Sequence, residues 1–194
     1  MNNRTNSEKK TKGEATRERL LNVAAAEFAS HGFYATKISG IVKLSGVTQP
    51  VFYSYFKSKE DAWETLVKEF DHRLEDLVVS MVIEATRPKE DVIASISESI
   101  KRFLLFFNQY HHLTMINLFQ PPQDVENRNK LKRWIARNMV IEQERGFYSD
   151  DISVDAMASC YLGVLIQTFL EHPDHERMDD ISRERAVFLA KGLT

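Results

Sequence analysis

The chain has 194 residues, of which 43% are hydrophobic, so it is long enough for one or two domains with a buried core. Its single cysteine excludes an intrachain disulfide, and no apolar run reaches the roughly 20 residues of a membrane helix. The N-terminus also lacks the apolar segment of a secretion signal. These features predict a cytoplasmic protein without a membrane partner.

The net charge of −2 conceals an asymmetry along the chain. Residues 1–59 carry ten Lys and Arg against four Asp and Glu, a formal charge of +6, and the remainder carries −8. A basic first third followed by an acidic remainder favours a polyanionic partner at one end, and nucleic acid fits this pattern better than a membrane does. Charge alone is equally consistent with a basic segment that only keeps the chain soluble.

Helical periodicity appears first in three short segments. Apolar residues recur at three- and four-residue spacing in 20–31, 38–45 and 48–56, and glycines end the first two helices. Thr48 is a suitable N-cap for the third helix, and Pro50 falls in its first turn, where a missing N–H has no effect.

Longer helices are expected in the rest of the chain. Ser58 caps a helix with an apolar stripe from Trp63 to Met81, which Arg87-Pro88 ends. Further helices are expected at about 90–110, 114–119, 125–145, 154–170 and 181–193. No strand or repeat is evident.

The fold class is therefore all-α, with about nine helices in total. We expect a disordered basic arm at 1–13, a three-helix helix-turn-helix domain at 14–58, and a C-terminal helical bundle at 59–194. The long fourth helix is expected to pack against both domains and tie them together, because the first is too small to be stable alone.

The two short helices at 38–45 and 48–56 have the spacing of a helix-turn-helix. In that motif the second helix enters the major groove of DNA with its N-terminal residues toward the base edges, here Thr48, Gln49, Pro50 and Val51. Gln49 can pair with adenine, and Val51 can meet a thymine methyl group.

Several polar side chains around this helix are candidates for the DNA backbone. The hydroxyls of Tyr53 and Tyr55 can reach phosphates, and Lys59 stands at a helix N-terminus, where charge and dipole both favour an anion. Thr36 and Lys37 precede the first short helix and can hold the same strand. The alternative is a set of ordinary capped helices with surface tyrosines.

Three runs of the N-terminal sequence resemble a known protein family. The run TRERLLNVAAAEFASHGFYAT at 16–36, GVT at 46–48 and FYSYFKSKE at 52–60 closely resemble the N-terminal domain of the TetR (tetracycline repressor-like) family. The resemblance implies a homodimeric transcriptional repressor, with phosphate contacts at Tyr53, Tyr55 and Lys59. Many members have Gly where this chain has Pro50, so the approach of the backbone to DNA differs there.

The resemblance also implies that the C-terminal domain binds a small inducer. Aromatic and Met walls suit an apolar or aromatic ligand. Candidate lining residues are Phe103, Phe107, Tyr110, Met115, Phe119, Trp134, Tyr161 and Gln167. Ordinary core burial is the alternative for each.

The helix expected at 154–170 is apolar on more than one face, so something must cover it. By resemblance, the last two helices pair with those of a second copy, and we expect Met157, Cys160, Val164 and Phe188 in this dimer interface. Burial within one subunit is the alternative. Cys160 is expected to be an inert buried thiol.

No phosphate-binding glycine loop, nucleophile elbow or strong metal-ligand spacing is present, so we expect no cofactor, no metal and no enzymatic activity. The sequence HPDHE at 172–176 is interpreted as a solvated loop. The expected partners are a double-stranded DNA operator, a small-molecule inducer and a second copy of the chain. A helical-bundle enzyme or carrier with a structural N-terminal module is the alternative function, and an activator or a regulator without a ligand also stays open.

Overall fold

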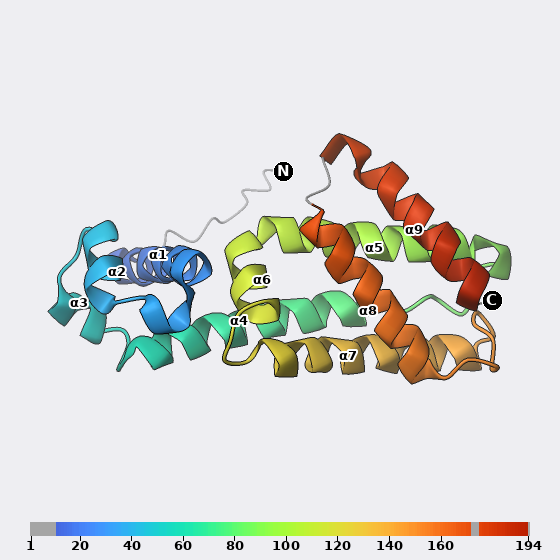
Figure 1. Ribbon diagram of the computed structural model, residues 1–194, viewed down its shortest axis with the longest axis horizontal. Coiled ribbons are helices and arrows are strands. Elements are labelled where there is room, and N and C mark those ends of the chain that lie inside the picture. Colours follow the sequence, from blue (N-terminus) through green and yellow to red (C-terminus); the bar gives the residue numbers. More distant parts are fainter. Residues whose placement is uncertain (1–10, 172–174, 194) are drawn as a thin grey trace, which may run out of the picture.

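The computed structural model describes residues 11–171 and 175–193, and within these ranges it consists of helices and connecting loops (Figure 1). The helices are α1 (Lys12–Ala35), α2 (Ile38–Leu44), α3 (Gln49–Tyr53), α4 (Lys59–Val79), α5 (Val92–Gln109), α6 (His111–Leu118), α7 (Asp124–Glu144), α8 (Val154–Leu170) and α9 (Met178–Leu193). Two short 3-10 helices lie at Lys89–Asp91 and His175–Arg177. The all-α prediction is confirmed in the part of the chain described.

Helix α1 begins earlier than the sequence indicated. The Thr11 hydroxyl accepts the Glu14 N–H at 3.2 Å, and the Glu14 carboxylate accepts the Thr11 N–H at 2.7 Å. This reciprocal pair satisfies N–H groups that a helix N-terminus otherwise leaves without partners. Residues 11–13 are therefore ordered rather than part of a disordered arm, and the remainder of the expected arm lies outside the described residues.

The end of α1 is fixed by side chains from both sides. Gly32 breaks the helical path with a φ of 77°, which favours glycine. The Thr36 hydroxyl donates to the Gly32 carbonyl at 2.8 Å. The Lys59 ammonium, on α4, donates to the carbonyls of Phe33 at 2.8 Å and of Thr36 at 3.0 Å. These contacts connect the start of α4 to the end of α1.

Two hydrophobic cores form, and α4 contributes to both. The first joins α1, α2 and α3 to Trp63, Leu66 and Val67 of α4, so it continues past the domain boundary expected at residue 58. The second joins α5, α7, α8 and α9 to Phe70 and Leu74 of α4. The stripe predicted on this helix thus ties the two domains together, as Figure 1 shows along its long axis.

Helix α6 makes a second connection between the domains. Ile116 is fully buried in the first core, whereas Leu118 is buried in the second. The Gln120 side-chain amide, just after α6, donates to the Ala29 carbonyl of α1 at 2.7 Å. Any shift of α6 therefore acts on α1 directly.

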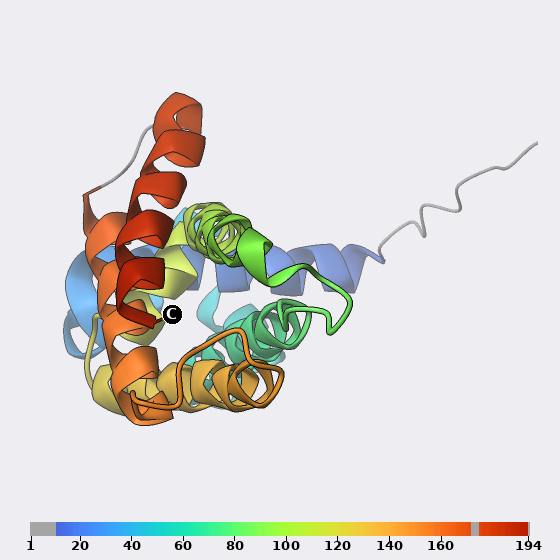
Figure 2. The same ribbon diagram turned by 90° about the vertical axis from the view of Figure 1, so that its right-hand side faces the viewer.

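The C-terminal helices differ from expectation mainly at one end of α4. This helix ends at Val79 rather than at Arg87-Pro88, and irregular chain then leads to α5. The Ile83 N–H in that segment donates to the Glu142 carboxylate at 3.0 Å instead of continuing a helix. Helices α8 and α9 lie along one side of the domain, as Figure 2 shows.

We expect Lys59→Met to lower the free energy of unfolding by about 2 kcal/mol, because it removes two charge-assisted hydrogen bonds from half-buried carbonyls and keeps the apolar stem. Urea denaturation measures the change. Lys57→Met is the control, since that side chain is exposed. Equal stabilities for the two variants would show that the ammonium does not hold α4 to α1.

Candidate functional site

The N-terminal end of α3 is a polar, exposed edge. Thr48, Gln49 and Pro50 are exposed, Val51 is half-buried, and Thr48 occupies the N-cap position without a side-chain cap hydrogen bond. Behind this edge, Phe52 is fully buried in the first core. Because α3 is anchored by its apolar side, it presents the amide and hydroxyl groups outward as one rigid unit.

The two tyrosines after this edge occupy different environments. Tyr53 is 53% exposed, and its hydroxyl makes no hydrogen bond with any described residue. Tyr55 is half-buried against the first core, and its hydroxyl lies beside Gly13, 3.6 Å from where a Cβ on that residue would stand. Tyr53 therefore points to solvent, whereas Tyr55 faces the start of α1.

Exposed lysines surround the same edge. Lys37 is the N-cap residue of α2, Lys43 lies in the last turn of α2, and Lys57 follows α3. Ammonium groups on both sides of a projecting helix can neutralise phosphates along two strands of a duplex. The surface formed by the exposed residues Lys37, Lys43, Thr48, Gln49, Pro50, Tyr53 and Lys57 is called the α3 surface below.

Two of the residues expected to hold the DNA backbone, Thr36 and Lys59, make hydrogen bonds within the fold. Thr36 is 4% exposed, and its hydroxyl donates to the Gly32 and Glu27 carbonyls. Lys59 has two of its three ammonium hydrogens on carbonyls of the α1 end, and its Nζ lies 4.5 Å from the centre of the Phe33 ring. The Lys59 bonds span 26 and 23 residues of chain, which is why the local sequence pattern did not indicate them.

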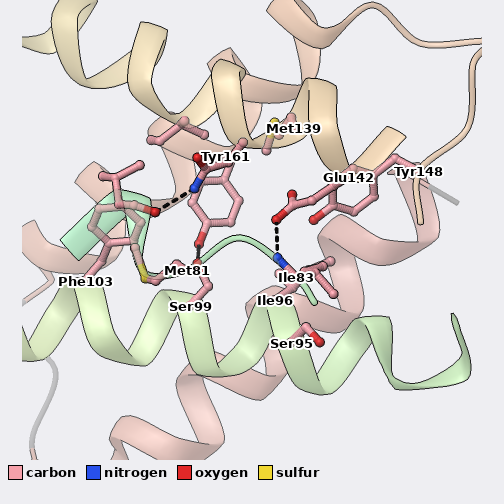
Figure 3. Close-up of a pocket in the computed structure, with 13 residues that line it drawn as sticks. Met81, Ile83, Ser95, Ile96, Ser99, Phe103, Met139, Glu142, Tyr148 and Tyr161 are labelled. Carbon is pink, nitrogen blue, oxygen red and sulfur yellow. Dashed lines mark hydrogen bonds between the residues drawn. The ribbon is translucent and has the colours of Figure 1, made fainter. Parts of the chain in front are cut away.

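A second polar site lies inside the C-terminal domain. A cavity of about 40 Å³ is enclosed by the end of α4, the irregular chain after it, and α5, α7 and α8 (Figure 3). Its walls are polar and apolar in nearly equal share. Its polar lining residues are Ser95, Ser99, Asn138, Glu142, Tyr148 and Tyr161. This cavity is called the inner cavity below.

Glu142 is the chemically distinctive group of the inner cavity. It is 5% exposed, and burial raises the pKa of its carboxyl to about 7, against the hydrogen bonds from the Ile83 N–H and the Tyr148 hydroxyl and the attraction of Arg145. Burial and then the neighbouring Glu142 raise the pKa of Tyr148 further above its usual range. Tyr148 therefore stays a phenol and donates to the carboxylate.

Two further hydrogen bonds shape the walls. The Tyr161 hydroxyl lies 2.5 Å from the Ser99 hydroxyl, and burial raises the pKa of this tyrosine as well. The Asn138 amide donates to the Val78 carbonyl at 2.6 Å, which holds α7 to the last turn of α4. The cavity walls thus include the end of the helix that also carries the first core.

The structure places two of the eight predicted inducer residues, Phe103 and Tyr161, on the inner cavity. Phe107 is fully buried in the second core, and the ring of Phe119 stacks on that of Phe169, with ring centres 5.8 Å apart. Met115 and Trp134 are half-buried and pack against the second core. Tyr110 accepts a hydrogen bond from Arg73, and Gln167 is exposed beside Glu171. An aromatic residue at helical spacing predicts an inward direction but not whether it meets a neighbour or a void.

Glu142 was missed because a glutamate normally indicates a solvated helix face. A signal was nevertheless present in the spacing. Leu131, Ile135 and Met139 form the buried stripe of α7, and Glu142 continues that stripe at the next position. A carboxylate in line with an apolar stripe is the pattern that could have found this group.

The predicted dimer residues lie on the α8–α9 side. Phe188 is 72% exposed, Val164 is half-buried, and Met157 is 1% exposed within its own subunit. Cys160 is exposed, which corrects the expectation of a buried thiol. An apolar groove of about 520 Å³ runs between Met157, Cys160 and Phe188.

The remaining expectations concern metals and membranes. His172 of the HPDHE sequence lies outside the described residues. Across 11–171 and 175–193, no group of three or more His, Cys, Asp or Glu side chains is arranged to hold a metal ion. No helix in the same ranges has the length and hydrophobicity to cross a membrane.

The part of the chain that carries the α3 surface is similar in sequence to known proteins. The family model for bacterial regulatory proteins of the tetR family matches residues 20–61. The HTH-type transcriptional regulator YdgC of Bacillus subtilis is 33% identical over 156 residues, 80% of each chain. The HTH-type transcriptional repressor KstR2 of Mycobacterium tuberculosis is 28% identical over 151 residues, 72% of each chain.

Solved structures extend the similarity to the whole fold. The fatty acid degradation regulator FadR from Bacillus halodurans superposes with a TM-score of 0.69 at 19% identity, over 95% of this chain and 98% of that chain. The C-terminal helices therefore share the architecture of that protein, although their sequences differ widely.

The raised pKa of Glu142 has a consequence for stability. An unfolded carboxyl loses its proton near pH 4.5 and the native one near pH 7, so the contribution of this group to stability is fully present below pH 4.5 and is lost as the pH rises to about 7. The loss is about 3 kcal/mol. We expect Glu142→Gln to remove most of it, measured as the difference in unfolding free energy between about pH 5 and pH 8. Glu144→Gln, on an exposed neighbour, should keep the wild-type pH dependence.

Proposed function

Because the chain belongs to the tetR family of bacterial regulatory proteins, and is thus a DNA-binding transcriptional regulator, we propose that it acts as a homodimeric repressor. In this proposal the dimer holds an operator through its two α3 surfaces. It leaves the operator when a small, largely apolar inducer occupies the inner cavity. The family also answers the enzyme alternative, since the chain falls among transcription regulators rather than catalysts.

The observation that carries the DNA-binding part is the exposed N-terminal edge of α3 over a fully buried Phe52. A rigid edge of this kind fits a major groove, in which Gln49 reads a base and Tyr53 contacts a phosphate. The exposed lysines around it supply the sequence-independent attraction. Thr36 and Lys59 then act by holding α1, α2 and α4 in place, and Lys59 has one hydrogen left for a phosphate.

The inducer part is supported by the position of the inner cavity. Its walls include Val78 in the last turn of α4, and the first turn of the same helix is bonded to the DNA-binding domain through Lys59. A ligand that moves the far end of α4 therefore acts on the orientation of the α3 surface. The dimer part is supported by the exposed Phe188 and the apolar groove beside it, because water-exposed apolar surfaces of this kind mark protein interfaces.

We expect Gln49→Ala to lower affinity for the operator about tenfold, because a good side-chain–base contact contributes about 1–3 kcal/mol of discrimination. Affinity for random DNA should stay unchanged. Fluorescence anisotropy with an operator selected from a random library and with a shuffled duplex measures both. Gln123→Ala, on an exposed glutamine of the C-terminal domain, is the control. Equal losses on both duplexes would reject Gln49 as a base reader.

We expect Phe188→Glu to convert the dimer into monomers, because a buried unpaired carboxylate at the centre of an apolar interface is strongly unfavourable. Light scattering coupled to size exclusion measures the molar mass. Val125→Glu is the control, since Val125 is also exposed, at 59%, but belongs to the start of α7 rather than to α8 or α9. A dimer that survives Phe188→Glu would place the interface elsewhere.

A further inference from the structure

We propose that the inner cavity binds an organic ammonium group, with the Glu142 carboxylate as its counter-ion and aromatic side chains around it. The inducer role of such a ligand rests on the function proposed above, whereas its binding does not. The ligand class is an alkylamine with a short apolar tail.

The Glu142 carboxyl is buried among neutral hydrogen-bond donors. The carboxyl is 5% exposed, and its hydrogen-bond donors are neutral: the Ile83 N–H at 3.0 Å and the Tyr148 hydroxyl. No Lys, Arg or His among the described residues forms a salt bridge with it. The guanidinium of Arg145, the cation that influences it, donates to the Ile83 carbonyl instead. A buried carboxylate without a cationic partner is strongly unfavourable, so the site is complementary to a positive charge.

Aromatic side chains form part of the walls of the inner cavity. Phe103, Tyr148 and Tyr161 all line the cavity, and the rings of Phe103 and Tyr161 meet edge to face at 6.2 Å. Aromatic rings attract ammonium groups through their negative faces, more strongly where water is excluded. The Tyr161 hydroxyl is occupied with Ser99 at 2.5 Å. The aromatic rings thus favour the same positively charged ligand that would pair with the Glu142 carboxylate.

The volume and the charge of the inner cavity restrict the head group that it can bind. A volume of about 40 Å³ holds a compact head group or about three waters, at 10–15 Å³ for each water. An anionic head group would meet Glu142 and be repelled. A purely apolar group would bury the carboxylate without any new partner, which is unfavourable. Of the three kinds of head group, the cation is the one whose binding improves the charge balance.

The inner cavity adjoins a larger hollow through which a ligand can enter. An outer hollow of about 210 Å³ shares Met81, Ile83, Ser95 and Ser99 with the inner cavity. Its rim holds two arginines and two glutamates, so its charge is balanced. The arginine side chains already donate to Ser95 and Ser80. Selection for charge therefore takes place at Glu142, and Met81, a flexible side chain, lies between the two spaces.

Three probes of one chain length test the proposal: n-butylammonium, 1-butanol and butyrate. Titration at about pH 8 keeps Glu142 ionised, since its pKa is about 7, and keeps the amine charged, as a lysine is near pKa 10.4. Arg145 is the charged group near Glu142, and burial raises the pKa values of the two phenols beside it, Tyr148 and Tyr161, so both phenols keep their protons at this pH. Calorimetry or ligand-observed NMR measures each dissociation constant with the full chain.

We expect n-butylammonium to bind at least about tenfold more tightly than 1-butanol or butyrate, the size of a charge-assisted hydrogen bond. Glu142→Gln should abolish this preference, and Glu144→Gln, on the exposed neighbour, should keep it. If Glu142→Gln does not fold, Tyr148→Phe provides a second variant, which should weaken amine binding while keeping the ring. Equal affinity for the three probes, no binding of any of them, or an unchanged preference in Glu142→Gln would overturn the proposal.

Operator release separates this inference from the proposed function. Anisotropy of labelled operator is measured with each probe at saturating concentration. Amine binding without release supports the ligand class and contradicts the inducer role of the cavity. Release by 1-butanol or butyrate alone supports an inducer site and contradicts the ammonium ligand.

Discussion

Helix α4 contributes to both hydrophobic cores, and the relation between the two domains depends on this sharing. Trp63 near its start packs edge to face on Phe28 of the first core, with ring centres 5.1 Å apart. Phe70 and Leu74 lie in the second core. A helix of 21 residues is about 30 Å long and resists bending, because every internal N–H is bonded within it. Movement at one end of α4 is therefore transmitted to the other rather than absorbed along the way.

The two ends of α4 are attached to different functional parts. Lys59 bonds its first turn to the end of α1, and Val78 in its last turn lines the inner cavity and accepts the Asn138 amide. Helix α6 packs against α4 and carries a buried amide group, on Asn117, that lacks hydrogen bonds. Asn117 is 1% exposed, and neither atom of its side-chain amide has a partner among the described residues. A buried amide without hydrogen bonds makes this part of the boundary between the cores easier to rearrange than a dry apolar contact.

The sequence predicted well those features that depend on neighbouring residues. The helices, the break at Gly32 and the exposed edge of α3 follow from periodicity, capping and glycine, all of which act over a few residues. The attachment of Lys59 to Phe33 could not be predicted in this way, because it spans 26 residues of chain. Thr36 bonds closer along the chain, to the Gly32 and Glu27 carbonyls, and its position before a helix is compatible with either a phosphate contact or a buried cap.

The inner cavity shows why binding sites are harder to predict than cores. An aromatic or apolar residue on an inward helix face reports the direction of a side chain, and Phe103 and Phe107 both point inward, yet Phe103 alone of the two meets the cavity. Whether a side chain meets a neighbour or a void depends on how well several distant helices fit together. That fit is a property of tertiary packing, which no single stretch of sequence records.

Glu142 is a residue whose role depends both on contacts distant in the chain and on the packing around a cavity. At its position on α7 a leucine or methionine would extend the stripe of Leu131, Ile135 and Met139 and fill the void. A core filled in that way would be more stable above pH 7, where the buried carboxylate is ionised. Glu142 instead places a destabilising charge in the interior, where it accepts the Ile83 N–H and faces a cavity. This departs from the rule that stable cores are built from apolar side chains. Such departures occur where a site serves binding, and the chemistry of this one is that of a receptor for positive charge.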